Sequence, residues 1–275
     1  MSNFCSVTVT FNTDLSTGEL QKQIKYLVEN NFKPLIVDNG SSNYEEIVQT
    51  VSSISSGIRT IHLDHNYGLG RALNIGTMEV LNKCDCDWIM SLDQDTYFYR
   101  DTFENLFDAI KKNDSISIFG LNYEKCRYSN KFLSNPTQNE VMTDFVITSG
   151  MIVKREVYSK VMYNERLFIY FEDYDFCNKA INAGFKIMLC SKARMKHLEG
   201  NRKIKNGREY FMIEPKRLDL IGRNSVWMMR KYWSINPVLY ALMLVFENCV
   251  ANNFPFRSLL YAFKGIVGGI VLPYE

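Results

Sequence analysis

The stretch Trp88-Ile89-Met90-Ser91-Leu92-Asp93-Gln94-Asp95 combines an apolar run with two carboxylates that are separated by one residue. The apolar run predicts a buried β-strand, and the carboxylates follow where that strand ends. Carboxylate oxygens are hard ligands, of the kind that Mg²⁺ or Mn²⁺ prefers when the cation also binds phosphate oxygens. We therefore expect Asp93 and Asp95 to hold one of these cations.

Outward from this stretch, the N-terminal half alternates short β-rich apolar runs with segments of helical period. This alternation is typical of βαβ units, and it predicts an α/β fold with a mostly parallel sheet flanked by helices. The predicted strands are residues 7–11, 34–38, 59–63, 88–92, 115–121 and 185–190. The predicted helices are residues 19–30, 69–82 and 173–183.

Polar residues follow three of the predicted strands. Asn12 follows the first, Asp38 and Asn39 end the second, and Asp93 ends the fourth. Ligands of open parallel sheets bind beyond the carboxyl ends of the strands. We therefore expect these side chains to gather around one cleft.

A second acidic cluster lies in the segment Tyr170-Phe171-Glu172-Asp173-Tyr174-Asp175. Three carboxylates this close repel one another unless a cation or a proton offsets them. One of them is suited to act as a general base. The alternative is a helix N-terminus that acidic side chains stabilise through the helix dipole.

Two further features point to the same cleft. Asn66-Tyr67-Gly68-Leu69-Gly70 introduces a predicted helix, and glycines at such a place let backbone N–H groups approach a phosphate or a sugar. His197 lies just past the strand predicted to end near Cys190. A lone histidine is more often structural, but a metal with an incomplete oxygen shell favours a ligand role here.

Composition excludes an intrinsically disordered chain. Of the 275 residues, 46% are hydrophobic and 23% are charged, which provides for a sizeable core. The 7 cysteines are scattered, which argues against a disulfide framework and for a reducing compartment. The first residues lack the basic segment of a signal peptide, so we expect a cytoplasmic protein.

Charge and hydropathy change towards the C-terminus. Residues 201–275 hold 11 basic and 5 acidic side chains, although the net charge of the chain is only +2. Residues 234–246 and 258–272 are largely apolar, but both are shorter than the ~20 residues of a spanning helix. We expect residues 226–275 to form a helical extension that packs as a hairpin, contacts a second subunit or lies on an anionic membrane surface.

Together these motifs resemble the inverting family 2 glycosyltransferases of GT-A fold, and most closely their bacterial rhamnosyltransferase branch. The resemblance covers roughly residues 6–225 and implies a GT-A domain over residues 1–225. The motifs that carry it stand in the family's order. They are Val9-Thr10-Phe11-Asn12, Val37-Asp38-Asn39-Gly40-Ser41, Asn66-Tyr67-Gly68 through Asn74, Asp93-Gln94-Asp95, Thr148-Ser149-Gly150, Phe171-Glu172-Asp173-Tyr174-Asp175, Gly184-Phe185-Lys186 and residues 197–200.

The resemblance implies residues for the donor and the metal. The side chains that would surround the nucleotide's base and ribose are Thr10, Asn12, Asp38 and Asn39. The segment that would contact the ribose or the donor sugar includes Asn66, Gly68 and Asn74. Asp93 and Asp95 would hold Mn²⁺ or Mg²⁺ against the diphosphate, with His197 as a further ligand of the metal or the diphosphate.

It also implies residues for the chemistry and the acceptor. Asp173 would be the catalytic base, and Arg223, followed by Asn224, would lie near the diphosphate or the acceptor. Gly150, Glu172 and Asp175 would lie on the acceptor side.

The expected activity is metal-dependent, inverting transfer of a sugar to a hydroxyl of a glycan or lipid-linked acceptor in cell-surface polysaccharide synthesis. Likeness to the rhamnosyltransferase branch favours rhamnose from dTDP-rhamnose. The basic stretch 192–231 suits a lipid diphosphate acceptor and peripheral contact with the anionic cytoplasmic face of the membrane. We expect no nucleic-acid partner.

Two alternatives stay open. A non-catalytic nucleotide- or partner-binding protein on the same fold would lack the carboxylates, whereas Asp93, Asp95 and Asp173 are present. A nucleotidyltransferase would carry a basic, glycine-rich phosphate loop after its first strand, where this chain has Asn12-Thr13-Asp14.

Overall fold

The computed structural model describes residues 2–126, 129–132, 134–135, 140–197, 201–253 and 256–274. The chain divides into two compact units. Unit 1 comprises Met1–Glu165 and Phe176–Leu198, and unit 2 comprises Arg166–Asp175 and Glu199–Glu275.

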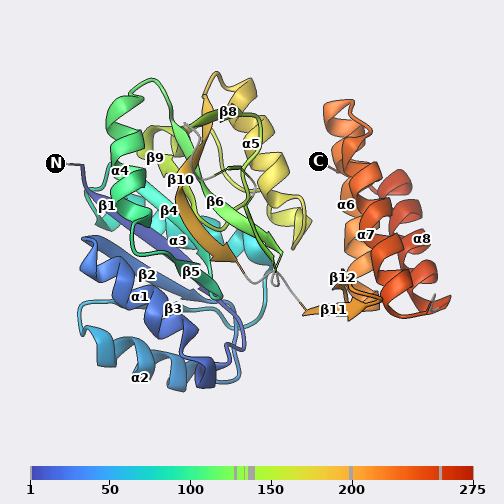
Figure 1. The fold of residues 1–275 in the computed structure, drawn as a ribbon, viewed down its shortest axis with the longest axis horizontal. Helices are drawn as coiled ribbons and strands as arrows, with labels where there is room; N and C mark the ends of the chain where they lie inside the picture. Colours follow the sequence, from blue (N-terminus) through green and yellow to red (C-terminus); the bar gives the residue numbers. More distant parts are fainter. Residues whose placement is uncertain are drawn as a thin grey trace. The chain divides into compact units, whose positions relative to one another are not determined.

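Unit 1 is built on one sheet with the strand order β3-β2-β1-β4-β9-β6-β10-β5 (Figure 1). In chain order its strands are β1 (Phe4–Thr10), β2 (Phe32–Asp38), β3 (Arg59–His62), β4 (Trp88–Asp93), β5 (Thr96–Phe98), β6 (Ile118–Cys126), β9 (Met151–Lys154) and β10 (Ile187–His197). Strands β3, β2, β1 and β4 are mutually parallel, as are β6 and β10, whereas β9 and β5 run antiparallel to their neighbours. Two short strands add to this sheet, both antiparallel to their partners: β7 (Ser129–Phe132) pairs with β6, and β8 (Val141–Thr143) pairs with β10.

Helices cover both faces of this sheet. On one face, α3 (Leu69–Lys83) and α5 (Glu172–Asn182) share a core with alternate strand residues such as Val7 and Val37. On the other, α1 (Glu19–Glu29), α2 (Tyr44–Ile54) and α4 (Thr102–Lys112) pack on the intervening residues, among them Ile36 and Met90. Because both faces are buried, the central strands read as continuous apolar runs.

The last long strand differs from the prediction. We expected it to end near Cys190 and His197 to lie past it, but β10 continues to His197. A bulge between Cys190 and Arg194 shifts its register with β6, and the far half of β10 pairs with β5. The side-chain amide of Asn122 donates to the Ser191 carbonyl oxygen at 2.7 Å and holds the bulge.

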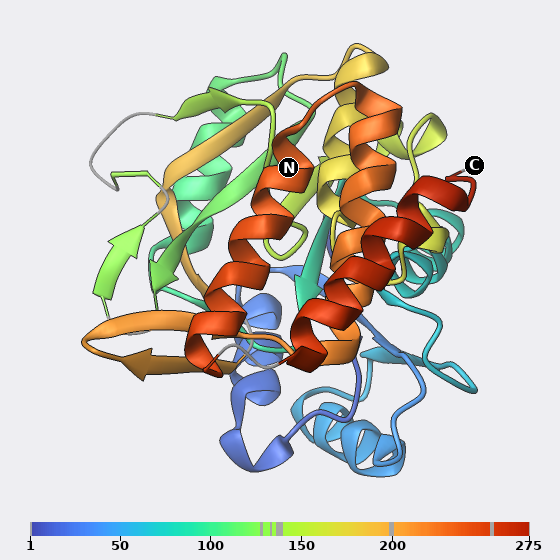
Figure 2. The same cartoon turned by 90° about the vertical axis from the view of Figure 1, so that its right-hand side faces the viewer.

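Unit 2 contains the hairpin β11 (Asn201–Lys205) and β12 (Arg208–Met212) and the helices α6 (Pro215–Tyr232), α7 (Asn236–Ala251) and α8 (Phe256–Val271). Figure 2 shows the three helices side by side, and α6 packs along α8. Their core includes Leu218, Trp227, Leu244 and Ala262. The helical C-terminal extension is thus confirmed, while the domain boundary expected at residue 225 stays a prediction; that residue lies within α6.

Candidate active site

A cluster of two carboxylates and one imidazole lies at the carboxyl end of β4. Asp93 ends β4, Asp95 follows two residues later, and His197 ends β10 opposite Thr96 of β5. His197 Nε2 lies 3.5 Å from Asp93 Oδ2, and its Nδ1 lies 3.5 Å from Asp95 Oδ1. One ligand atom from each residue falls within 4.8 Å of the others. Two hard oxygens and a borderline nitrogen form a donor set that fits Mn²⁺ or Mg²⁺.

The turn that carries these carboxylates is fixed from two sides. From α1, the buried Gln23 donates its amide to the carbonyl oxygens of Asp93 (2.8 Å) and Thr96 (3.1 Å). On the other side, Ser149 Oγ accepts the Asp93 N–H at 3.1 Å and lies 2.5 Å from Thr96 Oγ1. The turn that carries Asp93 and Asp95 is therefore held by two side chains, Gln23 and Ser149, for which the sequence predicted no role.

Gly150, predicted on the acceptor side, lies next to this support. Its φ of 78° is in the left-handed region, and an added Cβ would lie 2.6 Å from the sulfur of Met195. Its N–H donates to the Ser91 carbonyl oxygen at 2.9 Å. Only glycine fits here, so the close packing of two strands is enough to explain this residue.

Asp38 is the centre of a buried polar cluster at the ends of β1, β2 and β3. Its carboxylate accepts hydrogen bonds from the Thr10 hydroxyl (3.1 Å) and the Ser41 N–H (3.0 Å), and it lies 2.7 Å from His62 Nδ1. The Ser41 hydroxyl donates to it as well. Asp38 is fully buried, so these donors offset the loss of water around its charge. The register of β2 and β3 sets Asp38 opposite His62.

Three loops beyond the carboxyl ends of these strands are joined by the side chains of asparagines and serines. Asn12 has a left-handed φ of 46°, donates its N–H to Ser41 Oγ at 2.8 Å and accepts the Ser42 N–H at 3.0 Å. Asn39 donates to Asn66 Oδ1 at 3.1 Å, and that same oxygen accepts the Gly68 N–H at 2.9 Å. The structure thus brings together the residues predicted to surround the base and ribose.

Asn74 lies deeper, in α3, and holds a neighbouring segment. Its Oδ1 accepts the Tyr163 N–H, and its amide nitrogen donates to the Tyr163 carbonyl and to Glu165, each at 3.0 Å. Its predicted contact with the donor stays a prediction.

The acidic cluster at the start of α5 belongs to unit 2 up to Asp175. Asp175 is fully buried, and its Oδ1 accepts hydrogen bonds from Lys231 Nζ (2.7 Å) and the Tyr232 hydroxyl (2.8 Å). Glu172 is also buried, whereas Asp173 is half-buried and accepts the Tyr174 N–H at 2.7 Å. Asp173 and the cluster of Asp93, Asp95 and His197 lie in different units, so their convergence on one sugar stays a prediction.

The Arg223-Asn224 pair supports the segment before α5. The amide nitrogen of the buried Asn224 lies 2.9–3.0 Å from the carbonyl oxygens of Leu167, Ile169 and Tyr170. Arg223 donates to the Leu167 carbonyl oxygen at 3.3 Å and stacks over Trp227, and burial lowers the pKa of its guanidinium. Residues 198–200 of the last motif lie outside the described residues.

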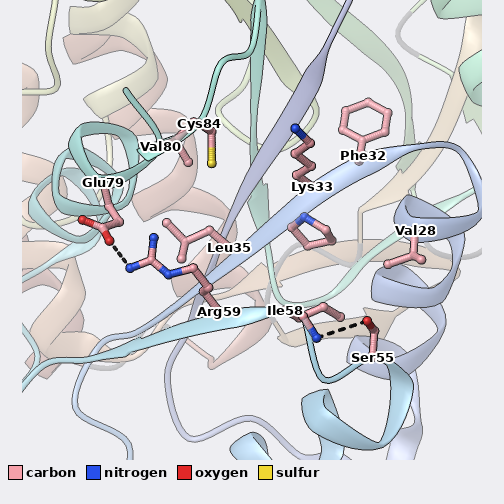
Figure 3. Close-up of a pocket in the computed structure, with 12 residues that line it drawn as sticks. Val28, Phe32, Lys33, Leu35, Ser55, Ile58, Arg59, Glu79, Val80 and Cys84 are labelled. Carbon is pink, nitrogen blue, oxygen red and sulfur yellow. Dashed lines mark hydrogen bonds and ion pairs between the residues drawn. The ribbon is translucent and has the colours of Figure 1, made fainter. Parts of the chain in front are cut away.

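A pocket of about 300 Å³ opens at the opposite ends of the strands (Figure 3). It lies at the amino ends of β2 and β3, and its lining includes Lys33, Cys84 and the ion pair of Arg59 with Glu79. None of the predicted site residues lines it. The polar groups that can act on a nucleotide gather instead at the carboxyl ends of the strands.

Comparison with known proteins agrees with this geometry. The family model described as glycosyl transferase family 2 matches residues 6–156. The dTDP-rhamnosyl transferase RfbF of Shigella flexneri is 27% identical over 266 residues, covering 88% of this chain and 86% of that protein.

Solved structures share the fold. Residues 1–349 of S. aureus TarS, in complex with UDP-GlcNAc, align over 96% of this chain and 79% of that one, with a TM-score of 0.62 and 14% identity. GalNAc-T7 with UDP, GalNAc and Mn²⁺ aligns over 84% of this chain with a TM-score of 0.58 and 14% identity. This chain spans 50% of GalNAc-T7 and 40% of a longer TarS chain. The predicted GT-A fold is confirmed.

Proposed function

Because the chain belongs to glycosyl transferase family 2, we propose that it transfers rhamnose from dTDP-rhamnose to a hydroxyl of a glycan or lipid-linked acceptor during cell-surface polysaccharide synthesis. The donor is suggested by the likeness to RfbF, a dTDP-rhamnosyl transferase. The observation that carries the transferase proposal is the cluster of Asp93, Asp95 and His197 beside the polar loops at one sheet edge. Both the cluster and the loops suit a nucleoside diphosphate, because its diphosphate binds a cation and its nucleoside forms hydrogen bonds.

We assign the cation site to Asp93, Asp95 and His197, with Mn²⁺ or Mg²⁺ as the ion. A divalent cation there would neutralise charge on the diphosphate as it leaves. The nucleoside would lie against the loops after β1 and β2, which Asp38 and Asn12 hold in place. The ribose or sugar would meet the loop of Asn66 and Gly68 at the start of α3.

Asp173 is our choice for the catalytic base. Of the three acidic residues at the start of α5, it is the one that is not buried, and Asp175 is already paired with Lys231. Asp173 would take the proton of the acceptor hydroxyl as that oxygen bonds to the anomeric carbon. The bond from this carbon to the diphosphate oxygen breaks in the same step, with its electron pair leaving on the diphosphate. Such a displacement inverts the anomeric configuration.

We further propose that α7 and α8 lie on an anionic membrane surface, where a lipid-linked acceptor would be found. Both helices expose large apolar side chains, from 41% exposed for Val267 to 77% for Phe256. They are Leu239, Tyr240, Leu242, Met243 and Phe246 on α7 and Phe256, Leu259, Leu260, Phe263, Val267, Ile270 and Val271 on α8. The charged residues of α8 are Arg257 and Lys264, both exposed and basic, and Lys264 Nζ also lies 3.1 Å from Asp219 Oδ2 of α6.

This pattern fits a lipid surface better than a second copy of the chain. An apolar face with basic side chains sinks into the headgroup region, where each cation near anionic lipid contributes about 1 kcal/mol. A symmetric dimer would bring like charges together on the same face. Among the described residues, no helix combines the length and the hydropathy needed to cross a bilayer.

Sedimentation with vesicles tests this contact. We expect salt-sensitive binding to vesicles of phosphatidylcholine and phosphatidylglycerol. We expect about tenfold weaker binding for Phe263→Asp, because this change removes an exposed aromatic side chain from the proposed membrane-binding face. Phe11→Asp, an exposed aromatic change in unit 1, is a control for hydrophobicity alone. Dimers in solution that bind no vesicle at low salt would refute the membrane proposal.

The transferase proposal is tested by hydrolysis of nucleotide sugars in the presence of Mn²⁺ or Mg²⁺. We expect release of the nucleoside diphosphate, and we expect this release to be fastest from dTDP-rhamnose. Chelation of the cation should abolish this hydrolysis. Full activity after chelation would contradict the cation site. The absence of both hydrolysis and binding across the panel would contradict the transferase assignment.

A further inference from the structure

Gln94, between the two aspartates, is bonded to the loop that follows β1. Its Oε1 accepts the Phe11 N–H and the Thr13 hydroxyl, each at 2.7 Å. Its Nε2 donates to the Phe11 carbonyl oxygen at 3.4 Å. One side chain thus meets both backbone groups of Phe11, as a neighbouring strand would.

The loop that Gln94 holds is also the loop of Asn12. Asn12 in turn is bonded to Ser41 and Ser42, and Ser41 is bonded to Asp38. A continuous series of hydrogen bonds therefore runs from the turn of the cation-binding carboxylates to the cluster assigned to the base and ribose. Gln94 is the side chain that joins the two.

The carboxylates themselves have separate support. Gln23 and Ser149 hold the backbone of Asp93 and Thr96. Removing the Gln94 side chain breaks its bonds to Phe11 and Thr13 and leaves these supports intact. The cation site and the nucleoside loop are therefore separable by substitution at this one position.

We propose that Gln94 is a positioning residue that keeps the loop after β1 in register with the metal-binding turn, so that the nucleoside and the diphosphate of one donor are bound together. The inference rests on the proposed function. It assigns to Gln94 a share of the affinity for the nucleoside part of the donor and none of the affinity for the diphosphate.

Calorimetry with Mn²⁺ and three probes, dTDP, UDP and inorganic pyrophosphate, tests this role. In Gln94→Ala we expect affinity for the favoured nucleotide to fall about tenfold, since the loop loses its anchor. Pyrophosphate affinity should stay within about twofold, because it depends on the cation site alone. Gln94→Glu keeps an acceptor for Phe11 and Thr13 but loses the donated bond. Its nucleotide affinity should therefore lie between that of the natural chain and that of Gln94→Ala.

A control substitution separates this role from general loss of structure. Gln49→Ala, at an exposed glutamine of α2, should bind both kinds of probe as the natural chain does. Unchanged nucleotide affinity in Gln94→Ala, or an equal fall for pyrophosphate, would overturn the inference. Failure of the natural chain to bind any nucleotide would overturn the proposed function, and this inference with it.

Discussion

Gly265 in α8 provides a sharp test of how unit 2 is held together. A Cβ at this position would lie 2.1 Å from the Asp219 carbonyl oxygen of α6, which is backbone and cannot swing away. Three residues later, Gly268 faces open space, with its nearest neighbour at 4.0 Å. The two glycines share one helix and differ in what they touch, so Gly268→Ala is a matched control for Gly265→Ala.

The expected effects follow from two opposed terms. Replacing a helical glycine by alanine stabilises a helix by about 1 kcal/mol. Overpacking a tight interface destabilises by up to about 3 kcal/mol, and a backbone clash of this depth belongs at that end. We therefore expect Gly265→Ala to lower the free energy of unfolding by about 2 kcal/mol and Gly268→Ala to raise it by about 1 kcal/mol.

Urea unfolding followed by tryptophan fluorescence measures both changes. Trp227 of α6 reports on this contact, because its indole N–H donates to the Leu272 carbonyl oxygen at 3.2 Å. The midpoint should fall for Gly265→Ala and rise for Gly268→Ala with the same slope. Equal effects of the two substitutions would refute the close approach of α6 and α8.

Three further predictions concern the site. Asp173→Asn should lower kcat on the order of 10²-fold with nucleotide binding intact. Asp175→Asn should instead lower the melting temperature, because it breaks the ion pair of the buried Asp175 with the partly exposed Lys231, at a cost of about 3 kcal/mol. A loss of turnover in Asp175→Asn with full activity in Asp173→Asn would move the base to Asp175. Asp95→Asn should weaken Mn²⁺ binding in calorimetry by about tenfold or more, and unchanged affinity would remove Asp95 from the cation site. Asp38→Asn should cost about 2 kcal/mol in urea unfolding, because a buried carboxylate accepts several hydrogen bonds that an amide cannot all keep, and an unaltered midpoint would contradict this.

The core strands could be predicted because their residues are buried on both faces. Runs such as the one ending at Leu92 are apolar because each strand is covered by helices on both faces, and this shows within the run itself. The helices between the strands show the helical spacing of their apolar residues. Strand β5 could not be predicted, since three residues carry no periodic signal. The extension of β10 to His197 depends on that same short strand and on a bulge held by Asn122, which lies far away in the sequence.

The same holds for the candidate site: residues with a local sequence signal could be predicted, and residues that act through contacts with distant parts of the chain could not. Asp93, Asp95 and His197 are visible in the sequence because carboxylates and imidazole are unusual after apolar strands, and the structure brings them together. Gln23 and Gln94 were missed, because glutamine has no pattern of its own and acts here through backbone groups of distant residues. The pairing of His62 with Asp38 could have been found from the parallel register of β2 and β3.

The segment before α5 shows how the position of Asp173, the proposed base, depends on more than the region that the family model matches. Phe168, Tyr170 and Phe171 all have φ values between 64° and 71°, which is strained for residues with large side chains. Such a backbone turns its carbonyl groups out of any regular ladder, and the amide nitrogen of the buried Asn224 lies within hydrogen-bond distance of three carbonyl oxygens of this segment. The match to family 2 ends at residue 156, inside unit 1, whereas Asn224 and Asp173 belong to unit 2. If Asp173 is the base, then α6 helps to set its position, and unit 2 takes part in the chemistry as well as in the proposed membrane contact.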